Sequence, residues 1–321
     1  MSNDLDEHYG TVLSAIADGE LVPFLGAGVN LCGRASDSTY KHGQNLPSAA
    51  ELSEFLAGEF EYRGANKDDL LRVSQYAAVM RGLGPLYRKL QFVFSAEYSP
   101  TPLHEFFASL PAILRDRNHP PYQLIVTTNY DDALERALKG AGQPFDVVTY
   151  VAEGENRGKF WHWPHGAEMR LINTPNEYHD LPIGENMDIQ RTVILKIHGA
   201  VDRSNVEQCS FVITEDHYID YLARTDISHL LPVQLKAKLR NSNYLFLGYS
   251  LRDWNLRVIL RRIWGEQKLS YSSWAIQLNP EPLDQKFWTS RGIEIMNQTL
   301  ESYISALKDR LLALASAKGE A

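Results

Sequence analysis

LVPFLGAGVNLCGR, residues 21 to 34, is an apolar run that reaches two glycines, Gly26 and Gly28, and then turns polar at Asn30. A strand followed by a glycine-rich turn is typical of α/β folds in which the turn approaches phosphate groups. The spacing GAGVNLCG differs from GxGxxG, and no acidic residue ends a second strand about 20 positions later, as a dehydrogenase requires. The stretch therefore predicts either a dinucleotide site of another geometry or a tight turn.

Composition limits the class of protein. The chain has 321 residues with 44% hydrophobic and 22% charged side chains, which is ordinary for a globular protein. No apolar run approaches the ~20 residues that span a bilayer, and the acidic N-terminus lacks the features of a signal peptide. We therefore expect a cytoplasmic protein without a membrane segment. The net charge of −8 argues against broad nucleic-acid binding, and we expect no sequence-specific contact with nucleic acid.

The two cysteines, Cys32 and Cys209, lie far apart in the sequence. One chain with two cysteines can build neither a disulfide framework nor a four-thiolate zinc site. Two other groups suggest chemistry more weakly. His162 and His165 in WHWPHG could bind a metal, but an aromatic loop is the simpler interpretation because no further ligand stands at a suitable spacing. Arg257 and Arg261 share a helix face that fits solvent or a partner better than phosphate.

Apolar runs alternate with segments of helical period along most of the chain. This alternation predicts an α/β, Rossmann-like, doubly wound and mostly parallel sheet within a single domain, residues 1–321. Residues 48–110 predict a helical insertion or subdomain, residues 152–190 a loop-rich segment, and residues 299–321 a C-terminal helix. We expect further helices near 131–140 and 253–264, and strands at 21–27, 124–129, 145–151, 192–199, 210–214, 243–250, 272–278 and 293–297.

Short polar signatures follow five of these strands: GAGVN at 26–30, TTNYDD at 127–132, HG at 198–199, GYS at 248–250 and Asn279. Each has a structural explanation, because glycines allow tight turns and Asn129 or Asp131 could cap the next helix. In a doubly wound sheet, however, the carboxyl ends of the strands meet at one crevice, where ligands bind. The repetition therefore predicts one shared site. His198 is a candidate base of ordinary pKa near ~6.5, with His165 as its main rival.

These motifs, in this order, resemble the SIR2 (sirtuin-like) superfamily over roughly residues 20 to 280. Within it, the chain is similar to bacterial SIR2-like effectors that hydrolyse NAD+ in anti-phage defence. The resemblance implies that NAD+ is the substrate and that Asn129, Asp131 and His198 are catalytic. It also implies NAD+ contacts from the residues at the other motif positions, namely Gly26, Ala27, Gly28, Asn30, Thr128, Gly248, Ser250 and Asn279.

Departures from the deacetylase pattern refine this expectation. The two CxxC pairs of the deacetylases are missing, so we expect no zinc module and no metal cofactor. The GIPDFR stretch is also missing, Asn30 replaces Ser, and Thr128 replaces Gln. These losses remove much of what would hold an acyl-lysine peptide, so NAD+ hydrolysis is favoured over the first alternative, a zinc-less NAD-dependent protein deacylase. The second alternative is a non-catalytic module that senses NAD+ or ADP-ribose, and the presence of both His198 and Asn129 argues against it, because a sensor does not need both.

The resemblance also implies partners. Effectors of this kind are activated by assembly, and we expect a homo-oligomer together with a separate protein, such as a HerA-type ATPase, a short Argonaute or another defence component. The chain carries no GxxxxGK[ST] motif, so an ATPase would be a separate polypeptide.

Overall fold

A computed structural model describes most of the chain, namely residues 2–35, 37–183, 190–203, 205, 208–223, 230–249, 257, 260 and 272–316. Within this part, nine strands form one twisted sheet in the order β11-β10-β9-β1-β2-β6-β3-β4-β5. All neighbouring strands are parallel except at one edge, where β4 pairs antiparallel with both β3 and β5. The strands are β1 Leu21–Leu25, β2 Leu124–Thr127, β3 Phe145–Tyr150, β4 Phe160–Trp163, β5 Arg170–Ile172, β6 Thr192–Lys196, β9 Asn243–Leu247, β10 Ser273–Ile276 and β11 Ile293–Met296.

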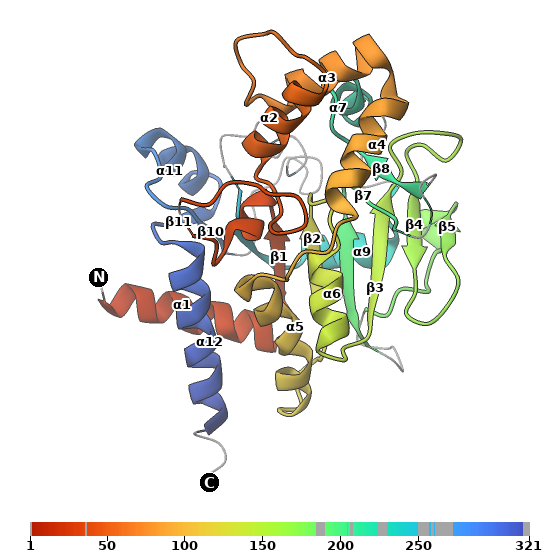
Figure 1. Ribbon diagram of the computed structural model, residues 1–321. Coiled ribbons are helices and arrows are strands. Elements are labelled where there is room, and N and C mark those ends of the chain that lie inside the picture. The colour runs from red at the N-terminus through yellow and green to blue at the C-terminus, as the bar shows by residue number, and fades with distance from the viewer. Residues whose placement is uncertain are drawn as a thin grey trace.

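Helices cover both faces of the sheet, which explains why the central strands are apolar almost throughout. On one face, alternate side chains of the strands pack against α1 (Ser2–Ala17), α5 (Pro102–Arg115), α6 (Ala133–Gly140) and α12 (Leu300–Ser316). The other face packs against α7 (Glu215–Ala223), α9 (Val233–Arg240) and α11 (Pro282–Thr289). Figure 1 shows the first group in front of the sheet and α9 behind it. The doubly wound α/β prediction is confirmed.

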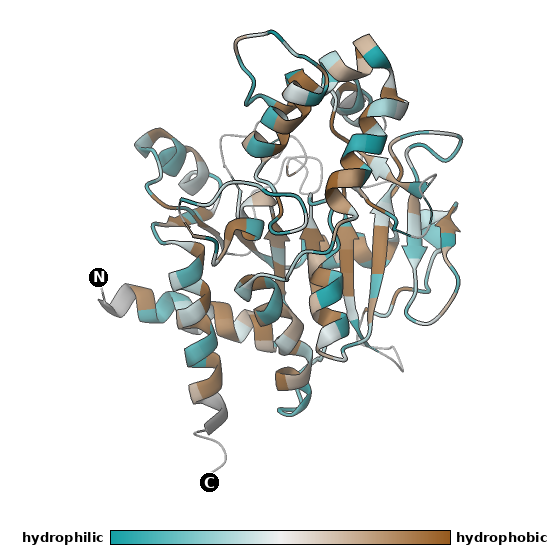
Figure 2. Ribbon diagram, viewed as in Figure 1, coloured by the Kyte–Doolittle hydropathy of each residue, from teal (hydrophilic) through white to brown (hydrophobic). Residues whose placement is uncertain are grey.

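A helical group lies over the carboxyl edge of the sheet. It consists of α2 (Ala49–Glu59), α3 (Leu70–Arg81) and α4 (Leu83–Phe94), with α7 beside them (Figure 1). Ser48 caps α2 in a reciprocal capping box with Glu51, and Asp69 caps α3. The group has its own apolar core, with Leu56, Val73 and Leu90 buried, and Figure 2 shows hydrophobic segments alternating with hydrophilic ones along its helices. Residues 48–110, expected to form a helical insertion, contain only helices as regular elements, but the group over the edge ends at Phe94, and α5 packs on the face of the sheet instead.

Two expectations differ from the structure. Residues 152–190 are not only loop, because they contribute β4 and β5 to the main sheet. The strand expected at 210–214 shrinks to β8 (Ser210–Phe211), which pairs with β7 (Gly199–Ala200) in a separate two-stranded sheet. Most of the helix expected at 253–264 lies outside the described residues. None of the described helices is long and apolar enough to cross a membrane.

Candidate active site

Four predicted strand ends line one cavity of about 640 Å³. They follow β9, β1, β2 and β6, which are consecutive strands of the sheet. The chain order of these strands reverses between β1 and β9, and ligands of doubly wound sheets bind at such a switch point. Eight of the predicted site residues line the cavity: Ala27, Gly28, Asn30, Thr128, Asn129, Asp131, His198 and Gly248.

The glycines of the first turn are required by a close backbone approach. A Cβ atom on Gly28 would lie 2.8 Å from the carbonyl oxygen of Gly248, and one on Gly26 would lie 2.6 Å from the same oxygen. The Gly28 amide donates to this oxygen at 2.9 Å, and the Gly26 amide donates to Leu247. These two amides therefore bond to the last residue of β9 and to the turn that follows it. Both amide hydrogens are thus already bonded within the protein, and Gly26 does not line the cavity, whereas Gly28 does.

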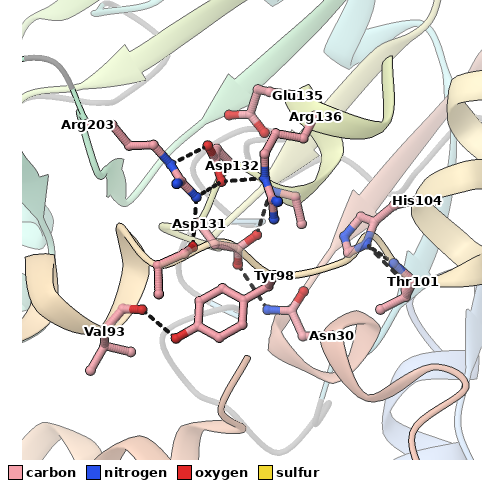
Figure 3. A network of polar contacts seen from close by, with 12 residues as sticks. Asn30, Val93, Tyr98, Thr101, His104, Asp131, Asp132, Glu135, Arg136 and Arg203 are labelled. Carbon is pink, nitrogen blue, oxygen red and sulfur yellow. Dashed lines mark hydrogen bonds and ion pairs between the residues drawn. The ribbon is translucent and has the colours of Figure 1, made fainter. Parts of the chain in front are cut away.

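Both carboxylate oxygens of Asp131 accept hydrogen bonds from other groups of the protein. Its Oδ2 accepts a hydrogen bond from Asn30 Nδ2 at 2.9 Å, and its Oδ1 accepts one from the backbone of Ala133 at 3.0 Å, at the start of α6. The other amide atom of Asn30, Oδ1, is buried and has no hydrogen-bond partner within the described part of the chain. Figure 3 shows the Asn30 amide turned toward Asp131. Asn30 therefore carries the unsatisfied acceptor at this point of the cavity wall.

His198 is almost fully enclosed, with 5% of its surface exposed. Its Nδ1 lies 3.5 Å from the hydroxyl of Tyr218, and the rings of Tyr218 and Tyr221 from α7 meet it edge-on. Its Nε2 is buried without a partner among the described residues. Burial lowers the pKa of His198 to about 3, so the expectation of an ordinary pKa is wrong and the imidazole is neutral at physiological pH.

The turn after β2 is held from both sides. Asn129 donates through Nδ2 to the carbonyl of Gly26 at 3.2 Å, and its backbone amide donates to Thr127 Oγ1 at 3.0 Å. The hydroxyl of Thr128 lies 2.8 Å from that of Tyr249, after β9. These contacts connect the turns after β1, β2 and β9 on one side of the cavity, so that the side chain of Asn129 has a defined position there.

The sequence did not indicate that the helical group closes the cavity from above. The first turns of α2 and α3 line it, with their caps Ser48 and Asp69. The N-terminal end of a helix carries partial positive charge, which suits anionic and hydroxyl groups of a ligand. The Pro47-Ser48 pair is a local sequence signal for the start of α2, but only the tertiary structure shows that this start faces the strand ends.

Several predicted groups lie elsewhere. Asn279 is exposed, has a left-handed φ of 50° and does not line the cavity, and Ser250 lies outside the described residues. His162 is buried within β4 and is hydrogen-bonded to Asp146 at 2.8 Å and to Tyr178 at 2.5 Å. It does not line the cavity, and neither does the exposed His165.

The candidate metal ligands and the arginines provide less support for a functional role. Over the described ranges, no cluster of three His, Cys, Asp or Glu side chains could hold a metal ion. Cys32 and Cys209 are free and buried. Arg257 contacts Asp284 at 3.4 Å and lies over the ring of Phe287, which agrees with a structural role. Arg261 lies outside the described residues.

Comparisons with known proteins agree with this geometry. A family model described as a SIR2-like domain matches residues 123–296, which include the ends of β2, β6 and β9. Defense-associated sirtuin 2 of Bacillus subtilis is 22% identical over 92% of this chain and 25% of its own length. An NAD(+) hydrolase ThsA of Enterococcus faecium is 26% identical over 84% of this chain and 43% of its own length.

A ThsA from Acinetobacter baumannii is 29% identical over 66% of this chain and 35% of its own length. The chain thus spans between a quarter and less than half of these curated relatives. A solved Sir2 structure aligns with 94% of this chain at 13% identity and a TM-score of 0.35.

Proposed function

The chain belongs to the SIR2-like domain family, and from this premise we propose that it hydrolyses NAD+ to nicotinamide and ADP-ribose as an effector of anti-phage defence. The observation that carries the proposal is the convergence of Asn129 and His198 on one cavity at the switch point of the sheet. The names of the relatives, NAD(+) hydrolase and defense-associated sirtuin, support the same activity and the same biological role.

The reaction breaks the bond between the ribose C1′ and the nicotinamide nitrogen, and water supplies the new oxygen at C1′. Nicotinamide leaves as a neutral molecule, and one proton of the water is released. The side chain of Asn129 orients the ribose or the water, since its amide both donates and accepts hydrogen bonds. His198 accepts the proton, because its neutral form is a base at physiological pH.

The low pKa of His198 affects this step. Burial disfavours the protonated imidazole in the free protein. A bound dinucleotide brings two negative phosphates into the same cavity, and nearby negative charge favours the protonated form. We propose that this negative charge partly offsets the effect of burial on the pKa of His198. Asp131 assists through Asn30, whose amide it orients, and not by direct contact with the nicotinamide.

The test is nicotinamide release by the purified chain, alone and with the product of the neighbouring gene. We expect His198→Ala and Asn129→Ala to abolish release while far-UV circular dichroism stays unchanged. His165→Ala is the matched control, because this rival histidine is exposed and outside the cavity, and it should keep full activity. Folded H198A and N129A proteins with normal release would contradict the assignment.

The products distinguish the other functions. O-acetyl-ADP-ribose formed only with an acetyl-lysine peptide would indicate a zinc-less deacylase. Saturable binding of NAD+ or ADP-ribose without turnover, even with the partner, would indicate a sensor. We expect ADP-ribose and nicotinamide without any peptide.

We also propose that the chain acts in the cytoplasm as a homo-oligomer with a separate protein partner. Exposed apolar side chains on the helical group support a protein contact there: Val79 and Met80 on α3 are 71% and 59% exposed, and Ile219 on α7 is 60% exposed. Gln75 donates to Asp216 at 2.8 Å, so the two helices lie side by side. Light scattering of the chain with and without the neighbouring gene product measures both assemblies.

A further inference from the structure

A lysine is buried in the central sheet beneath the candidate site. Lys196 is the last residue of β6 and is 1% exposed, although lysine is almost never buried without a partner. It lies two residues after Ile194, which packs on the α6 side of the sheet, and successive side chains of a strand alternate between faces. An apolar residue would therefore be expected here, and the charge needs an explanation.

The ammonium group of Lys196 has two partners. It contacts Glu135 Oε1 of α6 at 2.6 Å, and it donates a hydrogen bond to the backbone carbonyl of Asp131. Burial raises the pKa of Glu135, and the charge of Lys196 opposes this rise. The pair therefore costs free energy to desolvate, and buried pairs of this kind are weak contributors to stability. A role other than stability is favoured by this cost.

The position of the contact identifies the role. The Asp131 carbonyl belongs to the turn after β2, which also carries Asn129, and the Asp131 carboxylate orients Asn30. Lys196 comes from β6, only two residues before His198. One buried side chain thus connects the strand that carries His198 to the turn that carries Asn129 and Asp131. Figure 3 shows this turn between Glu135 and Asn30.

We infer that Lys196, held by Glu135, is a positioning residue that fixes the turn after β2 relative to His198 in the proposed NAD+ hydrolysis. It touches no substrate and acts through the Asp131 carbonyl. Catalytic groups that shift by about 1 Å can lose about 100-fold in rate. This inference deepens the proposed function and rests on it for its kinetic consequence, whereas its structural consequence can be measured without any activity.

The experiment uses the double variant Lys196→Met/Glu135→Gln. It removes the buried cation together with its counter-charge, so that no unpaired charge remains in the core. The matched control is Lys139→Met, which makes the same substitution at an exposed position of α6. Both proteins are compared with the wild type, with the neighbouring gene product present where activity requires it.

Two readouts are taken. Hydrogen exchange measured by mass spectrometry reports the peptide that covers residues 127–135, and steady-state kinetics give kcat and KM for nicotinamide release. We expect faster exchange in this peptide and a kcat reduced at least 10-fold in the double variant, with KM changed less than threefold and K139M like the wild type. A purely structural role predicts unfolding without a selective loss of kcat.

Wild-type exchange and wild-type kcat in the folded double variant would overturn the inference. If the wild type itself releases no nicotinamide under any condition, the proposed function fails, and the exchange of residues 127–135 still tests the contact. Unchanged exchange in that peptide would then overturn the positioning role by itself.

Discussion

The burial of His198 has a measurable consequence for stability. The pKa of this imidazole is lowered from 6.5 to about 3 in the folded protein, with burial as the cause. The unfolded chain therefore binds a proton at this imidazole near pH 6.5, whereas the folded protein binds it only at much lower pH. The stabilising contribution of the neutral form is complete above pH 6.5 and is lost as the pH falls from 6.5 toward 3.

The size of this effect follows from the linkage relation. Each pH unit below the unfolded pKa costs about 1.4 kcal/mol, so one such histidine removes about 2 kcal/mol of folding free energy between about pH 7.5 and about pH 5. Because the folded-state pKa lies well below pH 5, this loss depends almost entirely on the ordinary pKa of the unfolded chain. The result is therefore insensitive to the depth of the pKa shift.

The assay is urea unfolding followed by tryptophan fluorescence at both pH values, for the wild type and His198→Asn. The other buried histidines with lowered pKa, His8, His104 and His217, titrate in both proteins and cancel in the difference. We expect the wild type to lose about 2 kcal/mol more than H198N between the two pH values. Equal losses in the two proteins would show that His198 is not held neutral by burial, and would refute the reasoning.

Two further predictions concern stability alone. Gly28→Ala places a Cβ 2.8 Å from the Gly248 carbonyl oxygen and should lower the free energy of unfolding by about 1–3 kcal/mol. The control is Gly10→Ala, whose Cβ would have no atom within 4 Å, and it should not lower this free energy. Thermal unfolding of both variants measures the difference, and equal melting temperatures would contradict the close approach. His162→Ala breaks the buried hydrogen bond to Asp146, which keeps its contacts with Arg191 and the His165 amide, and should cost about 1–3 kcal/mol in urea unfolding, while nicotinamide release by the folded fraction stays normal. A selective loss of activity in H162A would contradict its structural role.

The sequence predicted the strands and the common location of their carboxyl ends, because both features are visible in short stretches of sequence. A buried parallel strand is a continuous apolar run, and a polar motif after it marks the carboxyl end. The edge hairpin was missed for a physical reason. Its strands, Phe160–Trp163 and Arg170–Ile172, are only four and three residues long and lie within a segment rich in glycine and proline. Such short strands are defined by their pairing, β4 with β3 and β5 with β4, rather than by their own residues.

The partners of the site residues were not predictable from local patterns. Asn30 and Asp131 are 101 residues apart in the sequence, and their hydrogen bond arises only because β1 and β2 are neighbours in the sheet. Lys196 did leave a signal, since a lysine interrupts the apolar run TVILKIHG. A charge inside a strand buried on both faces requires a buried partner, and this pattern could have identified the contact below the site.

The engaged glycine amides change where the phosphates of a dinucleotide would be held. Since the amides of Gly26 and Gly28 already donate to β9 and its turn, the first turns of α2 and α3 are the better candidates. These two ends differ in charge. Asp69 places a carboxylate at the start of α3, which repels phosphate and suits the hydroxyl groups of a ribose.

At α2 the cap is the neutral Ser48, and the carboxylate of Glu51 is paired with Arg34 at 2.5 Å. This pairing, together with backbone hydrogen bonds, lowers the pKa of Glu51 to about 2 although burial acts in the opposite direction. The carboxylate is thereby committed to the guanidinium group and the capping box, so the positive end of the helix remains available to an anion. In the proposed reaction the diphosphate therefore fits the α2 side of the cavity, and the ribose hydroxyls fit the α3 side.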